Sequence, residues 1–290
     1  MKRHLSKGLQ VATILAASAF TTHVIAATNS LQNVNSVRVL LDKVNTDYQM
    51  FKGENANPKY GEFLESDIDE LADARADLLD SAAADGHSAE VDSIEGNINR
   101  YLELLTESFE GISAGGYEIA AIAEEMQNKK MTAQRESSAL HKALAATSDV
   151  DPRAIEYQDL SFLMQQMAAR YLENAAASYG VAFRDLSDEK SIDQMAQEFS
   201  QRLDKLDINA KDLAPEVKAE LNDVKRKWGF IEQSMLNFMQ DQVSFLVYRY
   251  SGAIVENLRG ASRTLIGGDD TTMQLEGGQI PLPPGIPAAQ

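Results

Sequence analysis

Apolar side chains recur at steps of three and four residues along most of this chain, and that spacing limits what the chain can fold into. In the clearest case, from Val217 to Phe238, the step alternates between four and three. Such steps place side chains on one face of an α-helix, because successive residues turn by about 100° around its axis. Similar stripes begin at Val34, Leu64, Ile94, Leu160, Ile192 and Val243. With no convincing run of strand-like alternation beside them, we predict an all-α protein.

Glycine and proline mark where the predicted helices end and begin. The segment Gly53–Gly61, which contains Pro58, separates the first two helices. Gly86 ends the second helix, because glycine tolerates the left-handed conformation on which helices often end. Proline suits the first position of a helix, and a preceding Asp caps it. The remaining breaks are Gly115-Gly116, Asp151-Pro152, Pro215 and a loop over Gly180–Asp188, in which Ser187 is the predicted cap of the next helix.

These breaks divide the chain into two sets of four helices. We predict two tandem antiparallel four-helix bundles, over residues 27–148 and 149–266, because bundling buries a helix's single apolar stripe. A shift of 123 positions, the separation of Tyr48 and Tyr171, also superimposes many apolar positions. One interpretation is an internal duplication of units Leu31–Leu144 and Asp151–Ile266. The other is that any two amphipathic bundles can be slid into phase. Residues 267–290 form a Pro/Gly-rich tail that we expect to be disordered.

The first residues are typical of a secretory signal peptide. Lys2, Arg3 and Lys7 precede an apolar run over Leu9–Phe20, and small residues lead to Ala26. That run is shorter than the ~20 residues that a membrane span needs. We therefore predict a signal peptide over residues 1–26, cleavage before Ala27, a periplasmic location and no membrane insertion after cleavage. The chain has no cysteine, so neither a disulfide nor a lipid anchor at the cleavage point is expected.

The charge balance is strongly acidic. The full chain carries 27 Lys and Arg against 44 Asp and Glu, a net charge of −17. Removing the signal peptide takes away three basic residues, which leaves 24 basic against 44 acidic and a net charge of −20. Nucleic-acid binding depends on basic residues that neutralise phosphates, so we expect no nucleic-acid partner. The simplest role of such a charge is solubility.

Residues with catalytic or metal-binding potential are scarce. Beyond the signal peptide only His87 and His141 remain, at no metal-ligand spacing, and there is no nucleophile motif and no glycine-rich phosphate loop. An acidic stripe over Asp69–Asp80 is best interpreted as a solvated helix face. Hydrolysis by paired carboxylates stays open in so acidic a chain, although no pair stands out. We predict a non-enzymatic protein with no cofactor and no metal site.

One helix resembles a known family. The segment Phe162–Leu172 is similar to the signature helix, approximately R-M-L-S-Q-R-M-A-K-x-Y-L, of the PilJ-type N-terminal domain of type IV pili methyl-accepting chemotaxis transducers, which is related to nitrate/nitrite sensor domains. The segment from Trp228 to Ser251 resembles that family's closing helices. The resemblance implies an extracytoplasmic four-helix bundle that receives a signal. The matching positions are Leu163, Gln165, Met167, Ala168, Tyr171 and Leu172.

The departures from this family decide which residues are candidates. In the nitrate sensors, arginines of the signature helix hold the anion, and here those two columns fall on Ser161 and Gln166. In the first set of helices the same columns hold Arg38 and Lys43. The candidate ligand-binding residues are therefore Arg38, Lys43, Gln165 and Gln166, with a small anion as the expected ligand. No transmembrane output helix, kinase or methyl-accepting region follows, so we expect no signalling output domain.

Two functions follow from these patterns. The first is a periplasmic binding or sensing module, with an envelope or membrane-sensor protein as its partner. The second is a scaffolding protein of the envelope or pilus machinery. Arg38 and Lys43 lie about 140° apart around one helix, so holding one anion would need a bent side chain or a homodimer. The competing interpretation is that both simply neutralise nearby Asp42 and Asp47 on the surface.

Overall fold

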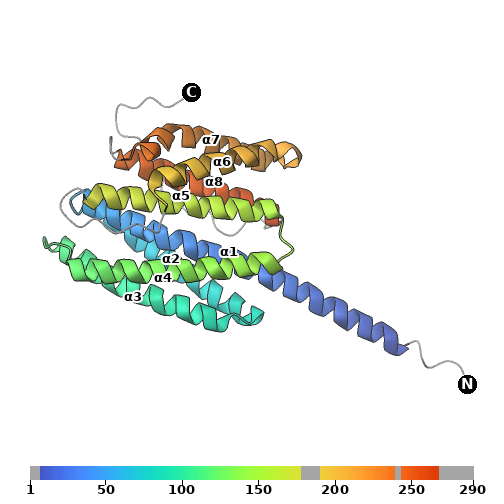
Figure 1. Ribbon diagram of the computed structural model, residues 1–290. Coiled ribbons are helices and arrows are strands. Elements are labelled where there is room, and N and C mark those ends of the chain that lie inside the picture. The colour runs from blue at the N-terminus through green and yellow to red at the C-terminus, as the bar shows by residue number, and fades with distance from the viewer. Residues whose placement is uncertain (1–6, 178–189, 239–242, 268–290) are drawn as a thin grey trace, which may run out of the picture.

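The computed structural model describes the backbone of residues 7–177, 190–238 and 243–267, and the side chains from residue 28 onward except Ala84. Within these residues the chain is all-α, as predicted, and it forms no strand (Figure 1). The helices are α1 (Lys7–Gly53), α2 (Pro58–Asp85), α3 (Ser88–Ser113), α4 (Ala120–Thr147), α5 (Pro152–Ala177), α6 (Ile192–Ile208), α7 (Pro215–Leu236) and α8 (Ser244–Ile266), with a short 3-10 turn η1 (Ala210–Asp212) before α7.

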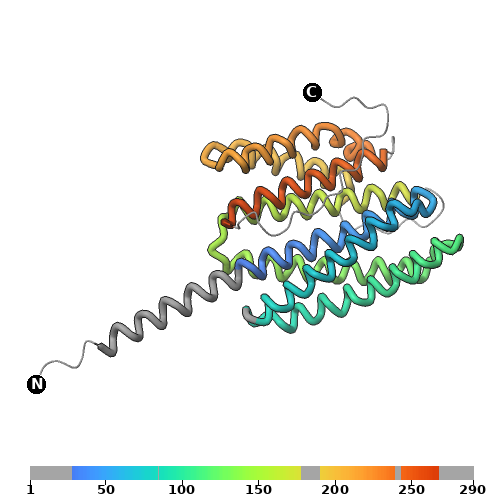
Figure 2. Tube along the Cα trace, turned by 180° about the vertical axis from the view of Figure 1, so that it is seen from behind, coloured from blue at the N-terminus to red at the C-terminus, as the bar shows by residue number. Residues whose placement is uncertain are grey.

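The helices form two antiparallel four-helix bundles that lie one above the other (Figures 1 and 2). In the first bundle α1 packs against α2 and α4, and α3 closes the ring against α2 and α4. In the second bundle α5 packs against α6 and α8, and α7 closes the ring against α6 and α8. The bundles meet where α1 packs along α5. Each bundle therefore repeats the same cyclic order of four helices.

Each bundle has its own apolar core. The stripe that begins at Val34 on α1 faces the core of the first bundle, together with Leu71 and Ile98. In the second bundle Trp228 is only 4% exposed, packs against Phe199 with ring centroids 4.7 Å apart and donates to the hydroxyl of Ser200. Trp228 is therefore a core residue, as the stripe from Val217 predicts.

The helix ends agree with the predicted breaks. Asn57 caps α2, which starts at Pro58, and Gly86 ends it in the left-handed conformation at φ 81°. Asp151 accepts a hydrogen bond from the backbone N–H of Arg153 at the start of α5. The predicted cap Ser187, the tail from residue 268 and the side chains of the predicted signal peptide lie outside the described residues. Ser191 caps α6, which begins at Ile192.

The helix α1 is covered on several sides at once. Besides its stripe in the first core, it sends Val39, Met50 and Phe51 into the core of the second bundle. The polar residues between these two apolar faces are consequently buried as well. Within the described part of the chain, no helix is long and apolar enough to cross a membrane.

Candidate functional site

Buried polar side chains follow α1 at helical spacing where it meets α4 and α5. We call this stripe, with the polar groups of α4 and α5 that it contacts, the α1 seam. Each of its five members on α1 is at most 5% exposed. Polar groups at such positions are rare unless they are paired. The five are Asn35, Arg38, Asp42, Asn45 and Gln49.

At one end of the α1 seam, Arg38 reaches across to the second bundle. Its two terminal nitrogens lie 3.4 and 3.3 Å from Asp159 Oδ1 on α5, and its guanidinium lies 4.1 Å from the ring centroid of Phe162. Burial lowers the pKa of Arg38, and the adjacent Asp159 opposes that shift. Arg202 of α6 lies 3.9 Å from the other oxygen of Asp159. Two guanidinium groups from different bundles therefore converge on one carboxylate.

His141 of α4 lies beside this pair. Its Nε2–H donates to Gln158 Oε1 at 2.8 Å, and its Nδ1 is 3.7 Å from Asp159 Oδ1. Burial and the nearby charge of Arg38 lower the pKa of His141 to about 4. The imidazole is thus neutral at pH 7, and it charges only when the medium is distinctly acidic.

The middle of the α1 seam holds an ion pair in which both partners are buried. Lys130 Nζ of α4 lies 3.4 Å from Asp42 Oδ1, and both side chains are at least 96% buried. Burial raises the pKa of Asp42, against the opposing effect of Lys130. One turn further along, Gln165 of α5 donates to the hydroxyl of Thr46 at 2.8 Å, and that hydroxyl donates to the carbonyl of Asp42.

Several polar atoms of the α1 seam have no well-formed hydrogen bond within the protein. A buried donor or acceptor left in this way costs about 1–3 kcal/mol, so a series of them on one helix requires an explanation. The seam offers donors and acceptors that folding alone does not use. The atoms are Asn35 Oδ1, Arg38 Nε, Asp42 Oδ2, Asn45 Nδ2 and Gln49 Oε1.

The structure brings only some of the predicted site residues together. Arg38 and Gln165 both belong to the α1 seam, while Gln166 is half-buried next to it on α5. Lys43 lies on another side of α1, where its Nζ is 2.6 Å from Asp67 and 3.6 Å from Glu70 of α2. Arg38 and Lys43 thus contact different helices, in keeping with their separation around α1. Whether any of these residues binds an anion stays a prediction.

The interpretation that Arg38 and Lys43 neutralise Asp42 and Asp47 on the surface is wrong. Asp42 and Asp47 are each only 1% exposed, and the closest ion pairs of the two basic residues are with Asp159 and Asp67. The physical reason is that both bundles cover α1. The partners on other helices were missed, although the spacing 35, 38, 42, 45 and 49 is a helical stripe visible in the sequence.

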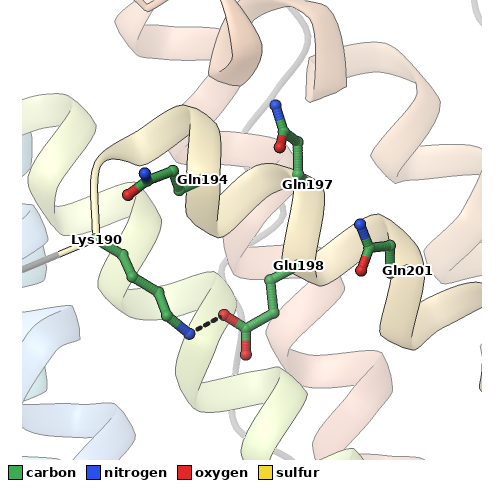
Figure 3. A pocket seen from close by; sticks show the side chains of 5 residues that line it. All are labelled: Lys190, Gln194, Gln197, Glu198 and Gln201. Atoms are coloured by element: carbon green, nitrogen blue, oxygen red, sulfur yellow. Dashed lines mark hydrogen bonds and ion pairs between the residues drawn. The ribbon is translucent and has the colours of Figure 1, made fainter.

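The surface hollows of the molecule are poorer candidates. One lies along α6, where Lys190, Gln194, Gln197, Glu198 and Gln201 line an open face and Lys190 bonds to Glu198 (Figure 3). All five residues come from one helix and the turn before it, so nothing encloses a ligand there. Among the described residues no group of acidic or histidine side chains is arranged to hold a metal ion.

Comparison with protein-family models, with curated proteins and with solved structures finds no match to this chain.

Proposed function

We propose that this chain is an exported, non-enzymatic binding or sensing module of the bacterial periplasm, and that the α1 seam receives its ligand. The observation that carries this proposal is the series of unpartnered buried polar atoms along α1. Natural proteins accept such a cost mainly at functional sites. The predicted signal peptide and the similarity of α5 to a sensor signature helix support the same function.

The chemistry of the seam favours a small polar anion. Arg38 Nε is an unused donor on a side chain that stays cationic at neutral pH. The other two guanidinium nitrogens of Arg38 contact Asp159, whose side chain is 37% exposed. An anion that competes with Asp159 would find Arg38 and Arg202 already arranged around it. Such a ligand would alter the contact between the two bundles, because Arg38 and Asp159 belong to different ones.

A thermal-shift screen of small anions and other small polar compounds tests this proposal. We expect at least one compound to raise the melting temperature of the wild type and of Arg135→Gln, whose arginine is exposed on α4. The same compound should produce little or no shift in Arg38→Gln. The absence of any shift, or equal shifts in all three proteins, would contradict the proposal.

The alternative is a scaffolding protein of the envelope or pilus machinery, and one surface feature favours it. Phe230 of α7 is 55% exposed and stacks on Tyr250 of α8, with ring centroids 5.1 Å apart. Exposed aromatic pairs are frequent at protein interfaces. If this alternative holds, the wild type should retain an envelope protein in a pull-down that Phe230→Ala does not retain, and the small-molecule screen should be negative.

A further inference from the structure

A second buried charged group lies on the side of α1 where it meets α2 and α8. At its centre is Asp47, whose side chain is only 1% exposed. Neither carboxyl oxygen of Asp47 has a well-formed hydrogen bond. Asp67 of α2 is also buried; its Oδ1 accepts from Lys43, and its Oδ2 has no partner. Asp47 and Asp67 are thus two buried carboxyls with more acceptor oxygens than the donors around them, Lys43 and the hydroxyl of Tyr248, fully satisfy.

The surrounding charges do not compensate for two ionised carboxylates. From α1, Lys43 is shared between Asp67 and Glu70. From α8, Arg259 lies 3.9 Å from Glu70 and 3.5 Å from Glu256. The charged groups packed here are therefore four carboxyls, of Asp47, Asp67, Glu70 and Glu256, against two cations.

Neutral groups complete the surroundings of Asp47. The hydroxyl of Tyr248 from α8 faces the carboxyl of Asp47. Tyr60 of α2 lies nearby, and burial, then the charge of Glu54, then that of Asp47 raise the pKa of Tyr60. From α5 the neighbouring contact is the uncharged bond between Gln165 and Thr46. Burial first, and then the facing Asp67, raise the pKa of Asp47 well above its ordinary value. Burial also raises the pKa of Tyr248, so its hydroxyl stays neutral.

We propose that Asp47 and Asp67 hold one proton between them, and that this proton allows α8 of the second bundle to pack against α1 and α2 of the first. The shared proton allows one carboxyl to donate a hydrogen bond to the other. When it leaves to solvent, two facing carboxylates repel each other in a buried site. The contact between the bundles then loosens. This site lies on a different side of α1 from the seam and does not depend on the ligand proposed there.

The pH dependence of unfolding tests the proton. Between the ordinary pKa of an aspartate and the raised one, the folded state holds a proton that the unfolded state has lost. The unfolding equilibrium constant of the wild type should therefore rise tenfold per pH unit relative to Asp47→Asn, whose amide keeps the shape but cannot ionise. The control Asp69→Asn changes an exposed aspartate of α2, the helix that carries Asp67. This variant should keep the pH dependence of unfolding of the wild type. Parallel curves for the wild type and Asp47→Asn would overturn the proposal.

Two measurements keep the proposal testable if Asp47→Asn does not fold. Carboxyl ¹³C NMR of wild-type protein with labelled aspartate should show a carboxyl that keeps its proton after the exposed ones have lost theirs.

The second measurement is the distance between the two bundles. Because the chain has no cysteine, spin labels can be attached only at the introduced Ala72→Cys of α2 and Gln233→Cys of α7. Their distance distribution should broaden as pH rises through the same interval. Ordinary titration of every aspartate would overturn the shared proton, and a pH-independent distance would overturn its effect on the bundles.

Discussion

At the scale of single residues, the notable feature of this protein is where its charges are. Arg38, Asp42 and Lys130 are all nearly fully buried. Transferring an ion into the interior costs several kcal/mol, and pairing recovers that cost only when the geometry is very good. At 3.3–3.4 Å, the pairs of Arg38 and Lys130 are longer than strong charge-assisted hydrogen bonds. Pairing at these distances therefore recovers little of the cost of burying the charges, which is one reason to assign these residues a function.

His141 gives a residue-scale prediction. Its pKa is about 4 in the folded protein, against 6.5 for the ordinary group. The folded state therefore binds this proton less tightly than the unfolded state, and the free energy of unfolding should fall as pH decreases from about 6.5 to 4. The part of this decrease in the free energy of unfolding that is due to His141 is on the order of 3 kcal/mol.

Chemical denaturation across this pH range checks the prediction with His141→Gln, which can still donate to Gln158. The free energy of unfolding of this variant, taken relative to the wild type, should increase as pH falls through the interval. Replacing the half-exposed His87 by Gln provides a matched control with little effect. A constant difference between wild type and His141→Gln would show that the imidazole charges normally in the folded protein.

Sequence patterns succeed for some residues and fail for others for a physical reason. Trp228 was correctly predicted as a core residue, because its position depends only on the apolar stripe of its own helix. For Arg38 the sequence leaves open a ligand-binding role or a surface location, because burial of an arginine depends on which helix covers it. Asp159 is 121 residues away from Arg38, and no local pattern connects the two. Residues positioned by long-range contacts cannot be placed from one helix alone.

At the scale of elements, the helix boundaries were the most predictable feature. Proline at 58, 152 and 215 starts α2, α5 and α7, since proline lacks the N–H that a first helical residue does not need. What the stripes did not predict is that α1 is buried on more than one side. Its stripe from Val34 is apolar, but Val39, Met50 and Phe51 face the other bundle, and three residues are too few to form a pattern.

The glycine that ends α2 gives the element-scale prediction. Gly86 has φ 81°, and a Cβ there would meet no atom within 4 Å, so only backbone strain opposes a substitution. Gly86→Ala should lower the free energy of unfolding by about 1 kcal/mol. Gly96→Ala, within α3 and equally open, should instead raise it by roughly 0.5–1 kcal/mol. Thermal or chemical denaturation of both variants checks this pair, and a change of the same sign in both would contradict the account.

At the scale of the whole molecule, the two buried groups impose opposite pH dependences. Through His141 the free energy of unfolding falls as pH decreases from about 6.5 to 4, and through the proton of Asp47 and Asp67 it falls as pH rises above the ordinary pKa of an aspartate. The two dependences oppose each other between about pH 4 and 6.5, so the free energy of unfolding of the wild type should change less with pH there than that of Asp47→Asn or His141→Gln. Both groups lie close to the surface of the first bundle that contacts the second. The contact between the bundles is therefore the part of the molecule most sensitive to pH.

If the polar groups along α1 serve function rather than stability, replacing a buried pair of them by apolar side chains should cost no stability. The most direct test is the free energy of unfolding of the double variant Asp42→Leu, Lys130→Met, measured by chemical denaturation at neutral pH. Removing one partner, as in Lys130→Met alone, should cost about 3–5 kcal/mol, because it leaves a buried carboxyl without its cation. Replacing both with apolar side chains should restore wild-type stability or exceed it. A double variant as unstable as Lys130→Met alone would show that the pair is there to hold the fold together, and would contradict the account.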